Sequence, residues 1–75
     1  MGDINYIEMG ARIRELREKN GYTVEALAAA LKVSPRVIYR WQNGETVPTV
    51  DHLFHMAKLF HTSMDYILSG EFIVA

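Results

Sequence analysis

The sequence predicts an all-α domain of five short helices. Apolar residues recur three and four positions apart, as they do on one face of a helix. Between these stretches stand hydroxyl residues and glycines, which favour helix starts and helix ends respectively. The pair Asn43-Gly44 is also a hairpin signal, but no alternating strand pattern flanks it, so we expect it to end a helix. The predicted helices cover about residues 6–20, 24–31, 35–43, 50–60 and 64–69 of one compact domain, residues 1–75.

The first predicted helix, 6–20, follows a loose lead at residues 1–5. Its inward stripe is Tyr6, Met9, Ile13 and Leu16, and Gly21 ends it because glycine adopts the left-handed conformation of a C-cap.

The helices at 24–31 and 35–43 are separated only by Lys32, Val33 and a capping serine. Thr23 caps the first of them, while Ser34 followed by Pro35 is a typical start for the second. A link this short prevents the two helices from lying antiparallel, so they must cross steeply. Ala28 stands at the expected crossing, where a methyl group permits close approach. This combination is the geometry of a helix-turn-helix.

The helix at 50–60 begins after Thr49 and has apolar residues on more than one side. Its apolar set is too wide for a single stripe, which predicts burial against several neighbours: Val50, Leu53, Phe54, Met56, Ala57, Leu59 and Phe60. Ser63 and Gly70 enclose the short helix at 64–69, and an apolar tail follows at 71–75.

Composition excludes several classes of protein. The chain has 75 residues and no cysteine, so it offers neither a disulfide scaffold nor a thiolate zinc site. The longest apolar run is Ala26–Leu31, far short of the about 20 residues that a transmembrane helix needs. We expect a soluble cytoplasmic protein, since no secretory signal is visible at the N-terminus.

Charge is unevenly distributed along the chain. Residues 12–40 carry seven basic and three acidic residues, whereas residues 41–75 carry one basic and four acidic residues. This asymmetry is typical of a protein with one DNA-facing side, although chance fluctuation would also produce it.

Three stretches together resemble the phage Cro and repressor type of helix-turn-helix, the XRE-type family. They are RIRELREKNGYT, SPRVIYRWQNGETVP and MAKLFHTSMDYILSG, and the resemblance runs from about Met9 to Gly70. In the twenty-residue motif that starts at Val24, Ala28, Val33, Ile38 and Trp41 occupy the small and apolar positions. The resemblance implies a repressor-like five-helix DNA-binding domain.

Three positions depart from the family pattern. Val24 replaces a glutamine that contacts phosphate in many members, and Lys32 stands where glycine is favoured in the turn. A left-handed Lys32 would cost about 1 kcal/mol. Gln42 replaces a glutamate that pairs with an arginine, here Arg17, so a neutral hydrogen bond is expected instead.

The resemblance and helix geometry together nominate the DNA-binding residues. A recognition helix inserts into the major groove, and Pro35, Arg36, Tyr39 and Arg40 lie opposite the Ile38 and Trp41 stripe. The two arginines are expected to bind guanine, while Pro35 and Tyr39 would contact a thymine methyl. The alternative is a pair of solvated surface arginines. The expected phosphate-binding positions, by resemblance, are Thr23, Ser34 and Asn43.

Other chemistries have weaker support. His52, His55 and His61 suggest a metal site, but a solvated histidine pair on the fourth helix is the favoured interpretation. No catalytic set or phosphate-binding loop is present in the sequence, so we expect neither an enzyme nor a cofactor.

Surplus apolar residues predict a homodimer. The small core has no evident place for Phe54, Leu59, Phe72, Ile73 or Val74, and pairing about a two-fold axis would bury them.

The sequence leaves two functions open: a regulator, expected to be a repressor, that binds a palindromic operator as a homodimer, or a protein-interaction module such as an antirepressor or antitoxin-like partner. Val24 and Glu45 favour the second function, whereas Arg36, Arg40 and Asn43 favour the first.

Overall fold

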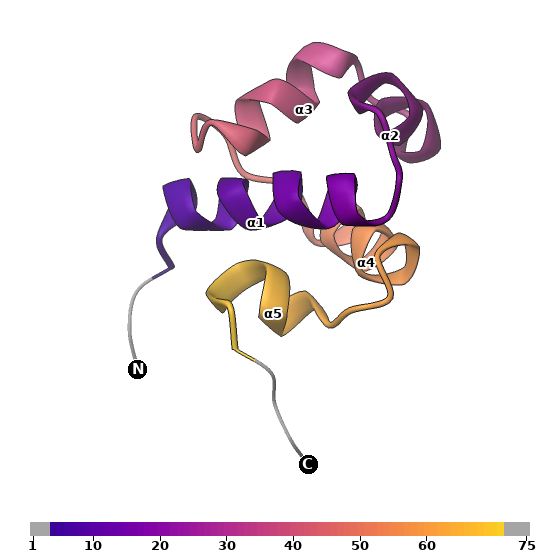
Figure 1. The fold of residues 1–75 in the computed structure, drawn as a ribbon. Helices are drawn as coiled ribbons and strands as arrows, with labels where there is room; N and C mark the ends of the chain where they lie inside the picture. The colour runs from indigo at the N-terminus through magenta and orange to yellow at the C-terminus, as the bar shows by residue number, and fades with distance from the viewer. Residues whose placement is uncertain (1–3, 72–75) are drawn as a thin grey trace.

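The structure, a computed structural model, describes residues 4–71, and within them it contains five α-helices and no strand. The helices are α1 (Tyr6–Lys19), α2 (Val24–Leu31), α3 (Pro35–Gln42), α4 (Val50–Leu59) and α5 (Met64–Ser69). The predicted all-α, five-helix fold is therefore confirmed. In Figure 1, α1 crosses the middle of the molecule, α2 and α3 lie above it, and α4 and α5 lie below and behind it.

A polar side chain precedes every helix and accepts a hydrogen bond from a backbone N–H of its first turn. The caps are Asn5, Thr23, Ser34, Thr49 and Ser63. Each satisfies a donor that the helix itself cannot pair. Asn5 was expected in a loose lead, but its side chain binds the Glu8 amide at 3.0 Å, which fixes the start of α1.

The core forms where the apolar faces of the helices meet, with α1 and α2 each packed against α3 and α5 packed against α1 and α4. No polar or charged side chain is buried among the described residues. Fourteen buried apolar residues make up this core: Met9, Ile13, Leu16, Val24, Leu27, Ala28, Leu31, Ile38, Trp41, Leu53, Met56, Ala57, Phe60 and Ile67.

Two expectations about burial are wrong. Tyr6 is half exposed rather than part of the inward stripe of α1, because the whole first turn is exposed and burial begins at Met9. On α4, Val50 and Phe54 are exposed, whereas Leu59 packs partly against the core. Helix α4 is consequently buried on one side, along Leu53, Met56 and Ala57.

Candidate nucleic-acid interface

The link between α2 and α3 is held by backbone hydrogen bonds at the end of α2. Lys32 adopts the left-handed conformation, with φ 58°, and the Val33 amide donates to the Ala28 carbonyl at 3.0 Å. Ala28 is 2% exposed, in agreement with a small residue where the helices meet. Ser34 then caps α3. Pro35 lies in its first turn, where a backbone N–H has no partner within the helix, so the N–H that proline lacks costs no hydrogen bond. The turn thereby fixes the direction in which α3 leaves α2.

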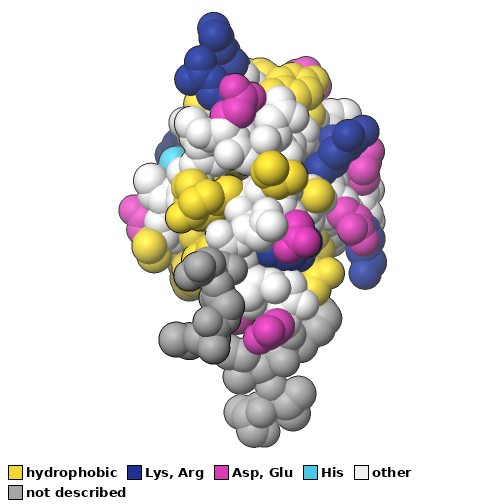
Figure 2. Space-filling view, turned by 90° about the vertical axis from the view of Figure 1, so that its left-hand side faces the viewer, with side chains coloured by type: hydrophobic (Ala, Val, Ile, Leu, Met, Phe, Trp, Pro, Cys, Tyr) yellow, Lys and Arg dark blue, Asp and Glu magenta, His cyan; other side chains and the backbone are white. Residues whose placement is uncertain are grey.

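Helix α3 has an apolar inner face and a cationic outer face. Ile38 is fully buried and Trp41 is 3% exposed, so Trp41 belongs to the core and not to a stacking platform. Pro35, Arg36, Tyr39 and Arg40, the four predicted base-contacting residues, are all exposed. Figure 2 shows Lys and Arg side chains at the top of the molecule, where α3 lies in Figure 1.

Arg36 and Arg40 lie one turn apart on this outer face. Within residues 4–71, neither guanidinium makes a hydrogen bond or an ion pair, so both remain available to a ligand. Tyr39, between them in sequence, is 50% exposed. The face can therefore offer two forked donors and one aromatic ring to a partner.

The three predicted phosphate-binding residues are exposed but lie at different helix ends. The hydroxyl oxygens of Thr23 and Ser34 accept from the Ala26 and Val37 amides at 3.0 and 3.4 Å. A hydroxyl that accepts a bond retains its own proton for donation. Asn43 ends α3, and its side-chain nitrogen donates to Glu45 Oε2 at 3.3 Å. A phosphate at Asn43 would therefore meet an acidic neighbour.

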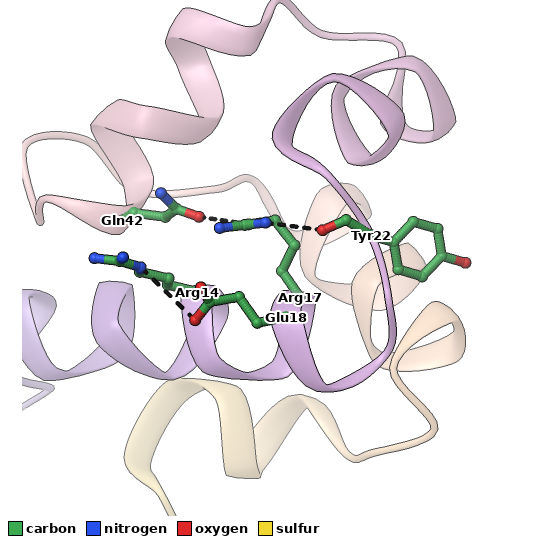
Figure 3. Close-up of polar contacts among 5 residues, drawn as sticks. All are labelled: Arg14, Arg17, Glu18, Tyr22 and Gln42. Atoms are coloured by element: carbon green, nitrogen blue, oxygen red, sulfur yellow. Dashed lines mark hydrogen bonds and ion pairs between the residues drawn. The ribbon is translucent and has the colours of Figure 1, made fainter.

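Arg17 joins α1 to the end of α3 (Figure 3). Its Nε donates to Gln42 Oε1 at 2.8 Å, and its Nη1 donates to the Tyr22 carbonyl at 2.8 Å. The expected hydrogen bond in place of an ion pair is present, with a charged guanidinium as donor and a neutral amide oxygen as acceptor. Arg14 on the same helix makes a longer contact with Glu18, 3.8 Å between Nε and Oε1, and both side chains are exposed. Such a surface pair contributes little to stability.

Gly10 brings the backbones of α1 and α3 together. A Cβ at this position would overlap the Trp41 carbonyl oxygen and lie 2.6 Å from that of Gln42. This glycine was not predicted from the sequence, because a glycine inside a helical pattern indicates only weakened helix propensity. The available signal was its place beside the inward stripe, directly after Met9 and three residues before Ile13.

The contacts of Arg12 show that not every basic residue of 12–40 is available to DNA. Its Nε and Nη2 donate to the Ile67 and Leu68 carbonyls at 3.1 and 3.0 Å, so it holds the end of α5. Arg12 and Arg17 both serve contacts between elements, and the seven basic residues of 12–40 therefore overstate the charge available to DNA. The cations nearest the turn and outer face of α3 are Lys32, Arg36 and Arg40.

The histidines are dispersed. The His52 ring lies against Trp41, with centroids 5.1 Å apart, and its Nδ1 is 3.0 Å from Thr49 Oγ1. The His55 ring instead meets Phe54. Among the described residues, no three His, Cys, Asp or Glu side chains could hold one metal ion. No helix within residues 4–71 is long and apolar enough to cross a membrane.

The predicted dimer surface is only partly described. Phe54 is 47% exposed, and Lys58 Nζ lies 4.7 Å from the centre of its ring. Leu59 is half-buried against the core. Phe72, Ile73 and Val74 lie outside the described residues.

The steeply joined pair α2–α3, with a buried crossing and an exposed cationic face, defines a helix-turn-helix protein. The chain belongs to the helix-turn-helix family, whose pattern matches residues 13–67.

Individual relatives agree with this assignment. The HTH-type transcriptional regulator DicA of Escherichia coli (strain K12) is 35% identical over 65 residues, 87% of this chain and 48% of that protein. The chain spans about half, or less, of the length of the curated relatives that it matches.

Solved structures share the fold. The P22 c2 repressor, solved with a synthetic operator, has a TM-score of 0.78 and 36% identity, covering 84% of this chain and 96% of that chain. Hydroxypropylphosphonic acid epoxidase from S. wedmorenis also has a TM-score of 0.78, at 22% identity, covering 99% of this chain and 44% of that chain. That second likeness shows the fold alone, which does not by itself define an activity.

Proposed function

We propose that this chain binds double-stranded DNA sequence-specifically and regulates transcription by inserting α3 into the major groove. The observation that carries the proposal is the outer face of α3, where Arg36 and Arg40 are exposed and make no hydrogen bond or ion pair with other described residues. Membership of the helix-turn-helix family supports it, as does the likeness to a repressor solved with its operator.

The outer face suits recognition of base edges. A guanidinium can donate two parallel hydrogen bonds to O6 and N7 of guanine, which discriminates against the other bases. Pro35 and Tyr39 add apolar surface for a thymine methyl. Thr23, Ser34 and Asn43 would hold the backbone, with the amides at the starts of α2 and α3 offering donors to phosphate. Arg17 and Gly10 position α3 rather than contact DNA.

Substitution of Arg40 tests the assignment. Arg40→Ala should weaken binding to the preferred duplex by roughly 1–3 kcal/mol and relax the preference at one base pair. Lys58→Gln is the matched control, because it also removes one exposed cation but on α4. Equal affinities of the parent and both variants would refute the proposed DNA face.

We also propose that the chain acts as a homodimer on a palindromic operator, as a repressor. Exposed Phe54 and half-buried Leu59, both on α4, offer apolar surface that a second copy would cover. The tail residues Phe72, Ile73 and Val74 would extend it. A two-fold axis there would separate two recognition helices by about 34 Å, one turn of DNA. Sedimentation of the parent and of a chain that ends at Gly70 tests this, and a parent that stays monomeric at every concentration excludes the dimer.

The alternative function is a protein-interaction module, and Glu45 is the observation that favours it. Its carboxylate accepts a hydrogen bond from the Asn43 side-chain amide and places negative charge at the end of α3, where DNA phosphate would approach.

The relatives are named as transcriptional regulators, and we accordingly propose that the chain is not an enzyme and acts in the cytoplasm.

A further inference from the structure

A hollow of about 260 Å³ lies on the side of α1 that faces away from α3. The end of α1 and the connection between α4 and α5 form its walls, and Figure 1 shows this connection below α1 while α3 lies above it. The lining residues are Leu16, Lys19, Asn20, Phe60, His61, Thr62 and Tyr66. A volume slightly under the usual range of roughly 300–1,000 Å³ for ligand sites suits a small molecule.

The floor and the rim of the hollow differ in chemistry. Leu16 and Phe60 are 8% and 3% exposed, and they belong to the core. Lys19 and His61 are exposed at the rim. Within the part of the chain that the structure describes, neither makes an ion pair, although Glu15 stands one turn before Lys19 on α1. The hollow thus combines an apolar base with an ammonium group and an imidazole ring, neither of which is paired with an acidic side chain among the described residues.

The backbone at His61 is a second, independent feature. His61 has φ 54°, and its amide and that of Thr62 close the end of α4 on the Lys58 and Ala57 carbonyls at 3.3 and 2.9 Å. This is a helix end where glycine fits without strain and an L-residue costs about 1 kcal/mol. A histidine at this position therefore makes the fold less stable than a glycine would, but it places an imidazole ring at the rim of the hollow.

We propose that this hollow binds a small organic anion, a carboxylate or a phosphate monoester with an apolar body. The apolar body would lie on Leu16 and Phe60, and the anionic group would lie between Lys19 and His61, with the Thr62 hydroxyl as a further donor. Because α3 is on the other side of α1, a bound ligand leaves the cationic face open. The proposal therefore stands independently of DNA binding.

Amide NMR spectra of the full chain, titrated at constant pH and ionic strength, test the site. Phenylacetate and phenyl phosphate are the anionic probes, and phenylacetamide is the neutral control. Shifts should concentrate at 19–20, 60–62 and 66 with either anion and be much weaker with the amide. The anion that binds with the higher affinity identifies whether the rim prefers a carboxylate or a phosphate group.

Two substitutions separate the site from general charge attraction. Lys19→Gln and His61→Asn should each weaken the binding of the preferred anion roughly tenfold, the effect of one charge-assisted hydrogen bond. Asparagine is chosen because it tolerates the left-handed conformation of His61. Lys58→Gln is the matched control and should bind as the parent does. Four outcomes would each overturn the proposal. They are equal shifts with the amide, shifts centred on Arg36 and Arg40, unchanged affinity in both site variants, and no shifts at all.

Discussion

Gly10→Ala tests how closely α1 must approach α3. The new methyl group would overlap the Trp41 carbonyl and lie 2.6 Å from the Gln42 oxygen. Both atoms belong to the backbone of α3, so no side-chain rotation relieves the overlap. An ordinary contact of about 3.4 Å at Gln42 would require α1 and α3 to separate by close to an ångström.

Two opposing terms determine the sign of this change. Alanine favours an α-helix over glycine by about 0.5–1 kcal/mol. Overpacking typically costs about 1–3 kcal/mol, and a rigid backbone neighbour argues for the upper part of that range. We therefore expect Gly10→Ala to lower the free energy of unfolding by about 1–2 kcal/mol. In a domain of this size the corresponding fall in Tm is roughly 5–15 °C.

Urea unfolding followed by circular dichroism measures the effect, and Trp41 fluorescence reports the displaced contact. Ala11→Gly is the matched control, since Ala11 is exposed on the same helix and its change isolates helix propensity. It should cost about 1 kcal/mol. A Gly10→Ala variant as stable as the parent, or more stable, would refute the close-approach argument.

Two further substitutions test individual contacts. Lys32→Gly should raise the free energy of unfolding by about 0.5–1 kcal/mol, because Lys32 is left-handed in the turn, and an unchanged or lower value in urea unfolding would contradict that reasoning. Arg12→Ala should cost about 1–3 kcal/mol by leaving the Ile67 and Leu68 carbonyls without their donor. Hydrogen exchange should then accelerate more in α5 than in α2, and equal protection of α5 in both proteins would show that Arg12 does not hold it.

Local signals in the sequence were sufficient to predict the five helices. Thr23 and Ser34 cap α2 and α3 through contacts three residues away, and Gly21 and Gly70 take positive φ just after α1 and α5. These features depend on neighbouring residues, so spacing and residue type reveal them. Asn5 was missed although its signal is equally local, since it lies before the first recognisable stripe.

Contacts between distant segments were harder to predict. The Arg12 bonds to α5 span 55 and 56 residues, and no local pattern marks such a partner. Phe54 and Val50 have the same apolar character as Leu53, yet only the packing of α4 against its neighbours determines which of them is exposed. The Arg17–Gln42 bond was predictable because the family resemblance named both positions.

The outer face of α3 itself emerged from the sequence, because helix periodicity places Arg36, Tyr39 and Arg40 opposite two buried residues. Periodicity gives the face but not its ligand. The base-contacting roles of these residues consequently remain a prediction.

Selection of bound sequences from a random duplex pool, repeated across salt concentrations, tests the central claim most directly. The parent should enrich a palindromic sequence, and its log K should fall with log salt at a slope on the order of −3 to −6 for a dimer. A variant with both Arg36 and Arg40 changed to alanine should lose the enrichment, whereas Lys58→Gln should keep it. No enriched sequence together with a slope near zero would contradict DNA recognition by α3 and favour the protein-interaction function.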